Sequence, residues 1–100
     1  MEFTREKNRI SYCNAAGDTM AEILFPASHD DTVEITHTFV DPSLAGQGLA
    51  AQLTAAAVDE LRRTHRRARL TCSYALRWFR QHPEAQDVLE DLSDISSEHK

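Results

Sequence analysis

The sequence has few of the residues that mark disulfide-rich, repetitive or membrane-spanning proteins. Its 100 residues include two cysteines, three glycines and three prolines, and no apolar run is long enough to cross a membrane or to act as a signal peptide. Cys13 and Cys72 form no Cys-x-x-Cys or Cys/His metal spacing, which favours reduced thiols in a cytoplasmic protein and no bound metal. We therefore expect one globular domain over residues 1–100, with a core at about 9–90 and no membrane contact.

Basic charge is scarce as well. The sequence has 11 lysines and arginines against 16 aspartates and glutamates, which gives a formal net charge of −5. A protein that contacts the phosphate backbone of nucleic acid normally carries a basic face, so nucleic acid is not expected as a partner. One basic cluster occurs at residues 62–69, where a helical pattern ends. Cations there complement the negative end of the helix dipole, although one arginine could also reach a cofactor phosphate.

Three segments near the N-terminus have β-strand patterns. Residues 9–13 alternate polar and apolar side chains, and residues 20–25 read as the returning strand after a turn. Residues 32–40 are rich in β-branched side chains and alternate strictly. Together these segments predict an antiparallel meander of three strands.

The pattern becomes helical from about residue 48 to residue 63, with several alanines that allow close packing on a sheet. Residues 69–73 are short and β-like, and we expect them to lie parallel to the third strand through a right-handed crossover. Residues 74–81 are helical again, a further turn starts at Pro83, and the polar tail 93–100 is expected to fray. The predicted fold class is α/β (α+β), a mixed sheet with helices packed on it in the order β-β-β-α-β-α.

The most informative segment joins the third predicted strand to the long helix. It reads Phe-Val-Asp-Pro-Ser-Leu-Ala-Gly-Gln-Gly-Leu-Ala over residues 39–50, with Gly46 and Gly48 in the turn. A glycine-bearing turn that opens a helix exposes N–H groups without intrahelical acceptors, at the positive end of the helix dipole. Phosphate binds well there because it needs many donors and little side-chain bulk. We infer that this turn holds the pyrophosphate of a nucleotide cofactor.

At these residues the chain resembles the GNAT superfamily of acetyl-CoA-dependent N-acyltransferases. The superfamily's pyrophosphate loop, Q/R-x-x-G-x-G/A at the start of a long helix, aligns with residues 45–50, and Gly48 and Ala50 take the two small positions. The resemblance implies that the pantetheine arm of acetyl-CoA lies between the third strand and the later parallel strand. It places the following residues at the cofactor: Phe39, Val40, Ala45, Gly46, Gln47, Gly48, Leu49, Ala50, Cys72 and Phe79.

A closer resemblance, over about residues 10–89, is to a short GNAT-like subfamily. Its members look like THTFVDPxLxGxGxAxxL followed by TCSYAxxxFxxHPExQDxL, and this sequence matches both patterns at residues 36–53 and 71–89. Two positions depart from the larger superfamily. Ala45 replaces a polar loop residue, so we expect weaker cofactor binding, and Phe79 stands where a proton-donating tyrosine is often found. The acceptor half of the fold is also expected to be short.

Three side chains are candidates for the acyl-transfer chemistry. His37 has the right chemistry for a general base, but strict alternation places it on the strand face of Ile35 and Phe39, where a packed core histidine is the alternative. Cys72 could act as a thiol at the acyl centre or be a small buried hydrophobe. Tyr74 could supply the hydroxyl that Phe79 lacks, or its ring could cap the second helix.

Three further residues have more ordinary interpretations. Glu34 lies on the opposite strand face from His37 and is a second candidate base, although a solvated carboxylate is favoured. We expect His82, which precedes a proline, to be a capping or surface residue. Trp78 is predicted to lie in the core or in the wall of the cofactor cleft.

The resemblance implies an enzyme, an N-acetyltransferase that transfers the acetyl group of acetyl-CoA directly to an unidentified amine. The acidic balance mildly favours a cationic amine. An acyl-CoA-binding module with little or no turnover is the alternative, and a small interaction domain whose glycine turn only starts a helix is a third possibility. We expect a monomer or weak dimer.

Overall fold

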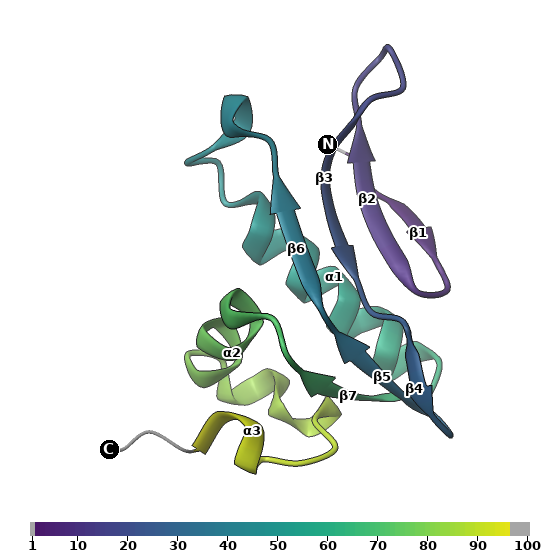
Figure 1. Ribbon diagram of the computed structural model, residues 1–100, viewed down its shortest axis with the longest axis vertical. Helices are drawn as coiled ribbons and strands as arrows, with labels where there is room; N and C mark the ends of the chain where they lie inside the picture. Colours follow the sequence, from purple (N-terminus) through teal and green to yellow (C-terminus); the bar gives the residue numbers. More distant parts are fainter. Residues whose placement is uncertain (1, 97–100) are drawn as a thin grey trace.

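The computed structural model describes residues 2–96 and contains two small sheets with helices packed on them (Figure 1). The strands are β1 (Thr4–Glu6), β2 (Arg9–Cys13), β3 (Thr19–Leu24), β4 (Ala27–His29), β5 (Thr32–Ile35), β6 (His37–Val40) and β7 (Arg67–Leu70). The helices are α1 (Leu49–Arg63), α2 (Ser73–Arg80) and α3 (Ser93–Ser96), with 3₁₀ turns η1 (Pro42–Leu44) and η2 (Pro83–Val88). No helix within residues 2–96 is long and apolar enough to span a bilayer.

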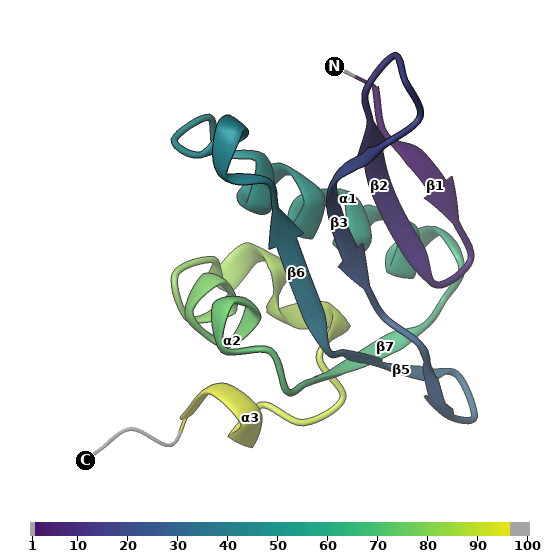
Figure 2. The ribbon, with the colours of Figure 1, turned by 45° about the horizontal axis from the view of Figure 1, so that its top comes forward.

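The two sheets confirm the predicted mixed α/β class. One has the strand order β1-β2-β3-β6 and is antiparallel, and the other has the order β4-β5-β7 and contains the parallel pair β5–β7. The meander prediction was right for β2, β3 and β6, while β1 and β4 are additional strands of three residues each. In both views α1 lies behind β3 and β6, and no helix of the described residues covers the front of the four-stranded sheet (Figures 1 and 2).

The core forms where α1 packs on the sheets. The alternation of β3 turns Ala21 and Ile23 toward α1, and both are fully buried. The helix contributes a stripe of side chains three and four residues apart, including Leu53, Ala57 and Leu61, which are also fully buried. Burying one such aliphatic side chain stabilises the fold by roughly 1.5–3 kcal/mol, and the alanines let the helix axis approach the sheet closely.

The segment 32–40 is two strands and not one, which corrects the prediction. The N–H of Thr36 donates to the oxygen of Leu24 at 3.2 Å, and the next residue, His37, is the Cα partner of the same Leu24. Thr36 and His37 therefore both lie opposite Leu24, as in a β-bulge. Because side chains alternate along a strand, this extra residue turns the side chains after it to the opposite face of the sheet. Ile35 is fully buried, whereas Phe39 is 37% exposed.

The parallel strand was predicted at 69–73 and lies at Arg67–Leu70, two residues earlier. It pairs with β5 from Thr32↔Arg67 to Ile35↔Leu70, and α1 forms the crossover. It ends because the N–H groups of Thr71 and Cys72 both donate to the oxygen of Ile35, each at 3.1 Å. The chain then turns into α2 and leaves β6 as the edge of its own sheet.

The C-terminal segment is more ordered than predicted up to residue 96. Asp94 accepts hydrogen bonds from the Nε and Nη2 of Arg69 at 2.9 and 3.0 Å, and from the N–H of Leu70 at 3.2 Å. Ile95 is 9% exposed and packs into the core. These contacts hold the turn of α3, which begins at the residue where the sequence predicts a frayed tail, and residues 97–100 of that tail lie outside the described residues.

Candidate functional site

The connection from β6 to α1 is anchored at its start by Asp41. The N–H of Asp41 donates to the oxygen of Met20 at 2.7 Å, which keeps the end of β6 attached to β3. The Asp41 carboxylate accepts from the hydroxyl and the N–H of Ser43 at 2.5 and 3.0 Å. These hydrogen bonds, the hydroxyl's first, lower the pKa of Asp41. The carboxylate therefore stays charged and fixes the short 3₁₀ turn that leads to the glycines.

Gly46 and Gly48 give the connection its shape. Their φ angles are +85° and +73°, in the left-handed region that favours glycine, and Gly48 is the N-cap of α1 without a side-chain cap. A Cβ at Gly46 would meet no protein atom within 4 Å, so backbone conformation, and not crowding, explains the glycine. The sequence predicted this turn-to-helix boundary to within one residue.

The backbone donors of this turn remain available. No hydrogen bond within residues 2–96 uses the N–H groups of Gly46, Gln47 or Gly48. The first intrahelical bond runs from Gln52 N–H to Gly48 oxygen, so the N–H groups between them lack helical acceptors. The first turn also carries no acidic side chain. These donors lie at the positive end of a fifteen-residue helix, an arrangement that fits a diphosphate.

A cavity of about 290 Å³ opens beside these donors, between the end of β6, the loop and α2. It brings together most of the loop residues that the sequence placed at the cofactor, and it adds Tyr74 from α2. Its lining residues are Val40, Leu44, Ala45, Gly46, Gly48, Leu49, Ala50, Ala51 and Tyr74.

Four predicted cofactor residues do not line this cavity: Cys72, which is described below, and the three that follow here. Phe39 points to the opposite, exposed face of β6, because the bulge at Thr36 reverses the alternation. Phe79 is fully buried and packs edge-to-face on Trp78 with ring centroids 5.0 Å apart, so it belongs to the core and not to the cavity wall. Gln47 is exposed, and its carbonyl oxygen accepts from Gln52 at 3.4 Å.

One edge of β6 is free, because β7 pairs with β5 and does not continue alongside β6. Donors of an antiparallel strand point alternately to its two neighbours, and Asp41 donates toward β3. The N–H groups of Thr38 and Val40 therefore point to the other edge, where no strand of the described residues pairs. Cys72 lies at this edge, with its sulfur 3.6 Å from the Thr38 hydroxyl. It is half-buried, between the two interpretations that the sequence left open.

Tyr74, the second residue of α2, lines the cavity. Burial raises the pKa of its phenol, and the charge of Arg77, whose guanidinium carbon lies 5.8 Å from the ring centroid, opposes this only in part. The phenol therefore holds its proton at neutral pH and can donate it.

His37 lies on the open face of the four-stranded sheet and not in the core. Its side chain is 51% exposed, and Nε2 is 3.8 Å from a carboxylate oxygen of Glu22. The prediction that it shares a face with Ile35 was wrong, because the bulge at Thr36 reverses the alternation between these two residues. Sequence reasoning missed Glu22 altogether, because only the β3–β6 register brings its strand beside His37. Glu34, the other candidate base, belongs to β5 and pairs in register with Arg69.

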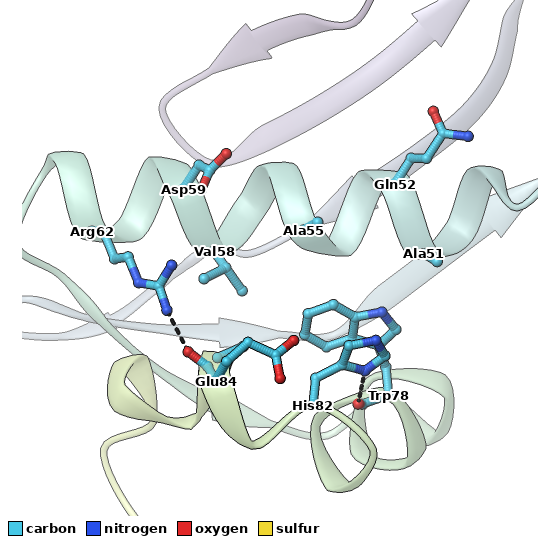
Figure 3. Close-up of a pocket in the computed structure, with 10 residues that line it drawn as sticks. Ala51, Gln52, Ala55, Val58, Asp59, Arg62, Trp78, His82 and Glu84 are labelled. Carbon is cyan, nitrogen blue, oxygen red and sulfur yellow. Dashed lines mark hydrogen bonds between the residues drawn. The ribbon is translucent and has the colours of Figure 1, made fainter.

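A second groove of about 370 Å³ continues along α1 from Ala51, which lines both cavities (Figure 3). Trp78 and His82 stack in its wall, with ring centroids 4.0 Å apart and planes at 12°. The His82 Nδ1 lies 2.7 Å from the oxygen of Trp78, and Arg62 bonds to the oxygen of Glu84 at 2.7 Å. Figure 3 shows the two rings beneath α1, with Arg62 at the far end of the groove.

The basic cluster near the end of α1 is largely paired. Arg62 binds both carboxylate oxygens of Asp87, at 3.0 and 2.6 Å, and Arg63 pairs with Glu60. Asp87 raises the pKa of Arg62. These contacts support the interpretation that the cluster serves the helix end and the adjacent surface.

Comparisons with known proteins identify the family and the fold of the chain. A family model described as GCN5-related N-acetyl-transferase matches residues 9–88. A GCN5-like protein of Staphylococcus aureus, assigned as a candidate N-acetyltransferase, is 26% identical, with 98% of this chain and 96% of that chain covered and a TM-score of 0.75. Among curated protein sequences, none matches significantly.

Larger acetyltransferases share the fold. A nourseothricin acetyltransferase is 16% identical with a TM-score of 0.53, over 73% of this chain and 46% of that chain. A Trypanosoma brucei acetyltransferase is 17% identical with a TM-score of 0.54, over 73% and 58%. The match thus spans about half the length of these two proteins. Since the family model covers most of the chain, this protein belongs to the GCN5-related N-acetyltransferase (GNAT) family.

Proposed function

We propose that the protein is an acetyl-CoA-dependent N-acetyltransferase that acetylates an amine directly. GNAT membership supports an acyl-CoA cosubstrate in general. The observation that carries the proposal is the cavity at the start of α1, which is lined both by the glycine turn with its free backbone donors and by Tyr74. A diphosphate on those donors would place an attached arm along the free edge of β6.

Three groups of the chain have roles in this proposal. When acetyl-CoA is bound, its thioester supplies the acyl carbon that the amine nitrogen attacks as the carbon–sulfur bond breaks. A β6 edge N–H, of Thr38 or Val40, donates to the carbonyl oxygen as it becomes negative. The Tyr74 phenol gives its proton to the departing sulfur, and the His37 imidazole takes the proton that the amine loses. Cys72 lies beside this edge and shapes it.

The groove with Trp78 and His82 extends the proposal to the other end of the cosubstrate. It continues from the loop through Ala51, and its stacked rings offer a flat surface for an adenine base. We propose that the nucleotide part of acetyl-CoA lies there.

An acyl-CoA-binding module with little turnover is the second candidate. One observation favours it: Phe79, at the position where relatives often have a tyrosine, is buried and has no proton to give. Turnover therefore depends on Tyr74 as its replacement.

Two measurements distinguish the enzyme from the binding module. Calorimetric titration with acetyl-CoA tests binding, and release of CoA in the presence of an amine panel tests transfer. Saturable binding with acceptor-dependent CoA release supports the enzyme. Binding with no acceptor-dependent release supports the module, and absence of binding rejects both.

A substitution in the glycine turn tests whether acetyl-CoA binds there. Gly48→Glu adds a negative charge at the proposed diphosphate site, and we expect acetyl-CoA to bind roughly a hundredfold more weakly. Gly17→Glu is the matched control, because Gly17 also has a positive φ, of +89°, and open space around it, but lies in the β2–β3 turn. Equal affinities of the two variants would show that the ligand binds elsewhere.

A further inference from the structure

Four charged or titratable side chains cross the open face of the antiparallel sheet, one from each strand. The Arg9 Nη1 lies 2.9 Å from a Glu6 oxygen, and the Arg9 Nε lies 2.9 Å from Glu22 Oε1. The other oxygen of Glu22, Oε2, lies 3.8 Å from His37 Nε2. The row therefore runs from β1 to the edge strand β6 and ends at the histidine proposed as the base.

Arg9 fixes the Glu22 carboxylate in this row. Its guanidinium is held at a third point by the Thr19 hydroxyl, 3.2 Å from Nη2. Glu22 and Glu6, in this order, raise the pKa of Arg9, which stays charged. Glu22 is the least exposed member, at 21% of its side chain against 32% for Arg9 and 51% for His37. With Oε1 bound by Arg9, Oε2 remains for the imidazole.

We propose that Glu22 is a positioning residue for His37, an inference that rests on the proposed acetyl transfer. Its carboxylate accepts from Nε2–H and so favours the tautomer of His37 that carries its proton on Nε2. The lone pair of the neutral ring is then on Nδ1. A ring held in one tautomer presents one basic atom in one direction, the role that a buried carboxylate has in catalytic triads. The 3.8 Å separation is slightly longer than a hydrogen bond, and catalytic contacts of this kind often tighten only when substrate binds.

The second candidate base, Glu34, lies on a strand of the other sheet. Glu34 of β5 is in register with Arg69 of β7, and Arg69 is bound by Asp94 of α3. Within residues 2–96, Glu22 is the carboxylate that lies within 4 Å of a His37 nitrogen. The pairing is therefore specific to the β3–β6 register.

Imidazole NMR tests the pairing without any need for turnover. Long-range ¹H–¹⁵N spectra distinguish protonated from unprotonated ring nitrogens, and we expect neutral His37 to carry its proton on Nε2 in the native protein. Glu22→Leu should change this tautomer ratio, and Glu22→Gln should change it less, because the amide oxygen can still accept. His37 signals that are identical in all three proteins, each folded by circular dichroism, would overturn the proposal.

Steady-state kinetics test what the Glu22–His37 pairing contributes to acetyl transfer. With an acceptor from the amine panel, Glu22→Leu should lower kcat about tenfold and leave acetyl-CoA affinity unchanged, since a lost orientation affects proton transfer only. Glu90→Gln is the matched control: it removes the carboxylate 3.0 Å from His29, and should alter the His29 signals but not kcat. A wild-type kcat in Glu22→Leu would overturn the positioning role. If the native protein turns over no amine, the proposed function fails, whereas the pairing is still decided by the NMR spectra.

Discussion

The strands β5 and β6 follow one another in a single alternating segment, yet they lie in opposite surroundings. In β5, Val33 and Ile35 are buried in the hydrophobic core. In β6, His37 and Phe39 continue the same alternation in sequence but lie on an exposed sheet face. Their partners differ as well, because β5 pairs with β4 and β7, while β6 pairs with β3 and has a free edge.

The difference shows how one extra residue can create a site. The bulge at Thr36 turns the second half of the segment over and moves it to the other sheet. The parallel strand stays with β5, so a gap remains beside β6 in which Cys72 and Tyr74 lie. On this comparison, substitutions in β5 should affect stability, and substitutions around β6 should affect function.

The largest expected effect is on the stability of β5. Ile35→Ala should lower the free energy of unfolding by about 2–5 kcal/mol, because the side chain is fully buried and its removal leaves a cavity. Urea unfolding followed by circular dichroism measures the change. A loss of less than about 1 kcal/mol would contradict the assignment of β5 to the core.

The next effect concerns the gap beside β6. Tyr74→Phe should lower kcat about a hundredfold, since it removes the proton for the departing sulfur. Acetyl-CoA affinity should be nearly unchanged, because the ring still lines the cavity. As burial raises the pKa of Tyr74 above its ordinary value, the phenol keeps its proton at neutral and mildly alkaline pH, so this residue alone causes no fall in rate between pH 7 and pH 9. Equal kcat values for the two proteins would remove Tyr74 from the chemistry.

A smaller effect is expected from the thiol at the edge. Cys72→Ala should lower kcat about fivefold and alter acetyl-CoA affinity less, because the sulfur contacts the Thr38 hydroxyl at the point where the acyl group would lie. Cys13→Ala is the control, since Cys13 is the other free thiol and is exposed on β2. If both variants have native kinetics, Cys72 is a packing residue only.

Much of the fold could be predicted from the sequence because its patterns are local. The helical spacing fixed α1 to within a residue, and the glycine turn before it followed from the freedom of Gly46 and Gly48 to adopt positive φ. The crossover placed β7 parallel to β5 by a general rule of handedness. The helix and the turn depend on short stretches of chain, and the crossover rule leaves few possible topologies.

The site was less predictable, because it depends on long-range pairing. The bulge arises where Leu24 meets Thr36 and His37, and no local pattern in 32–40 indicates the extra residue. The Glu22–His37 contact and the Trp78–His82 groove likewise depend on how distant elements pack. Such contacts follow from register and packing, which one sequence does not specify.

The smallest effect should be at Phe39, which sharpens the comparison with Ile35. Two interpretations differ here: a resemblance-based one, in which Phe39 contacts the cofactor, and the structural one, in which its ring lies on the exposed face. Phe39→Ala should therefore leave acetyl-CoA affinity within about twofold of the native value and cost about 1 kcal/mol of stability or less, because the ring is packed on one side only. Calorimetric titration and urea unfolding of the same sample measure both quantities. A tenfold loss of affinity would place Phe39 at the cofactor and would mean that β6 turns its other face to the cavity, so that the bulge at Thr36 would no longer account for the exposure of His37.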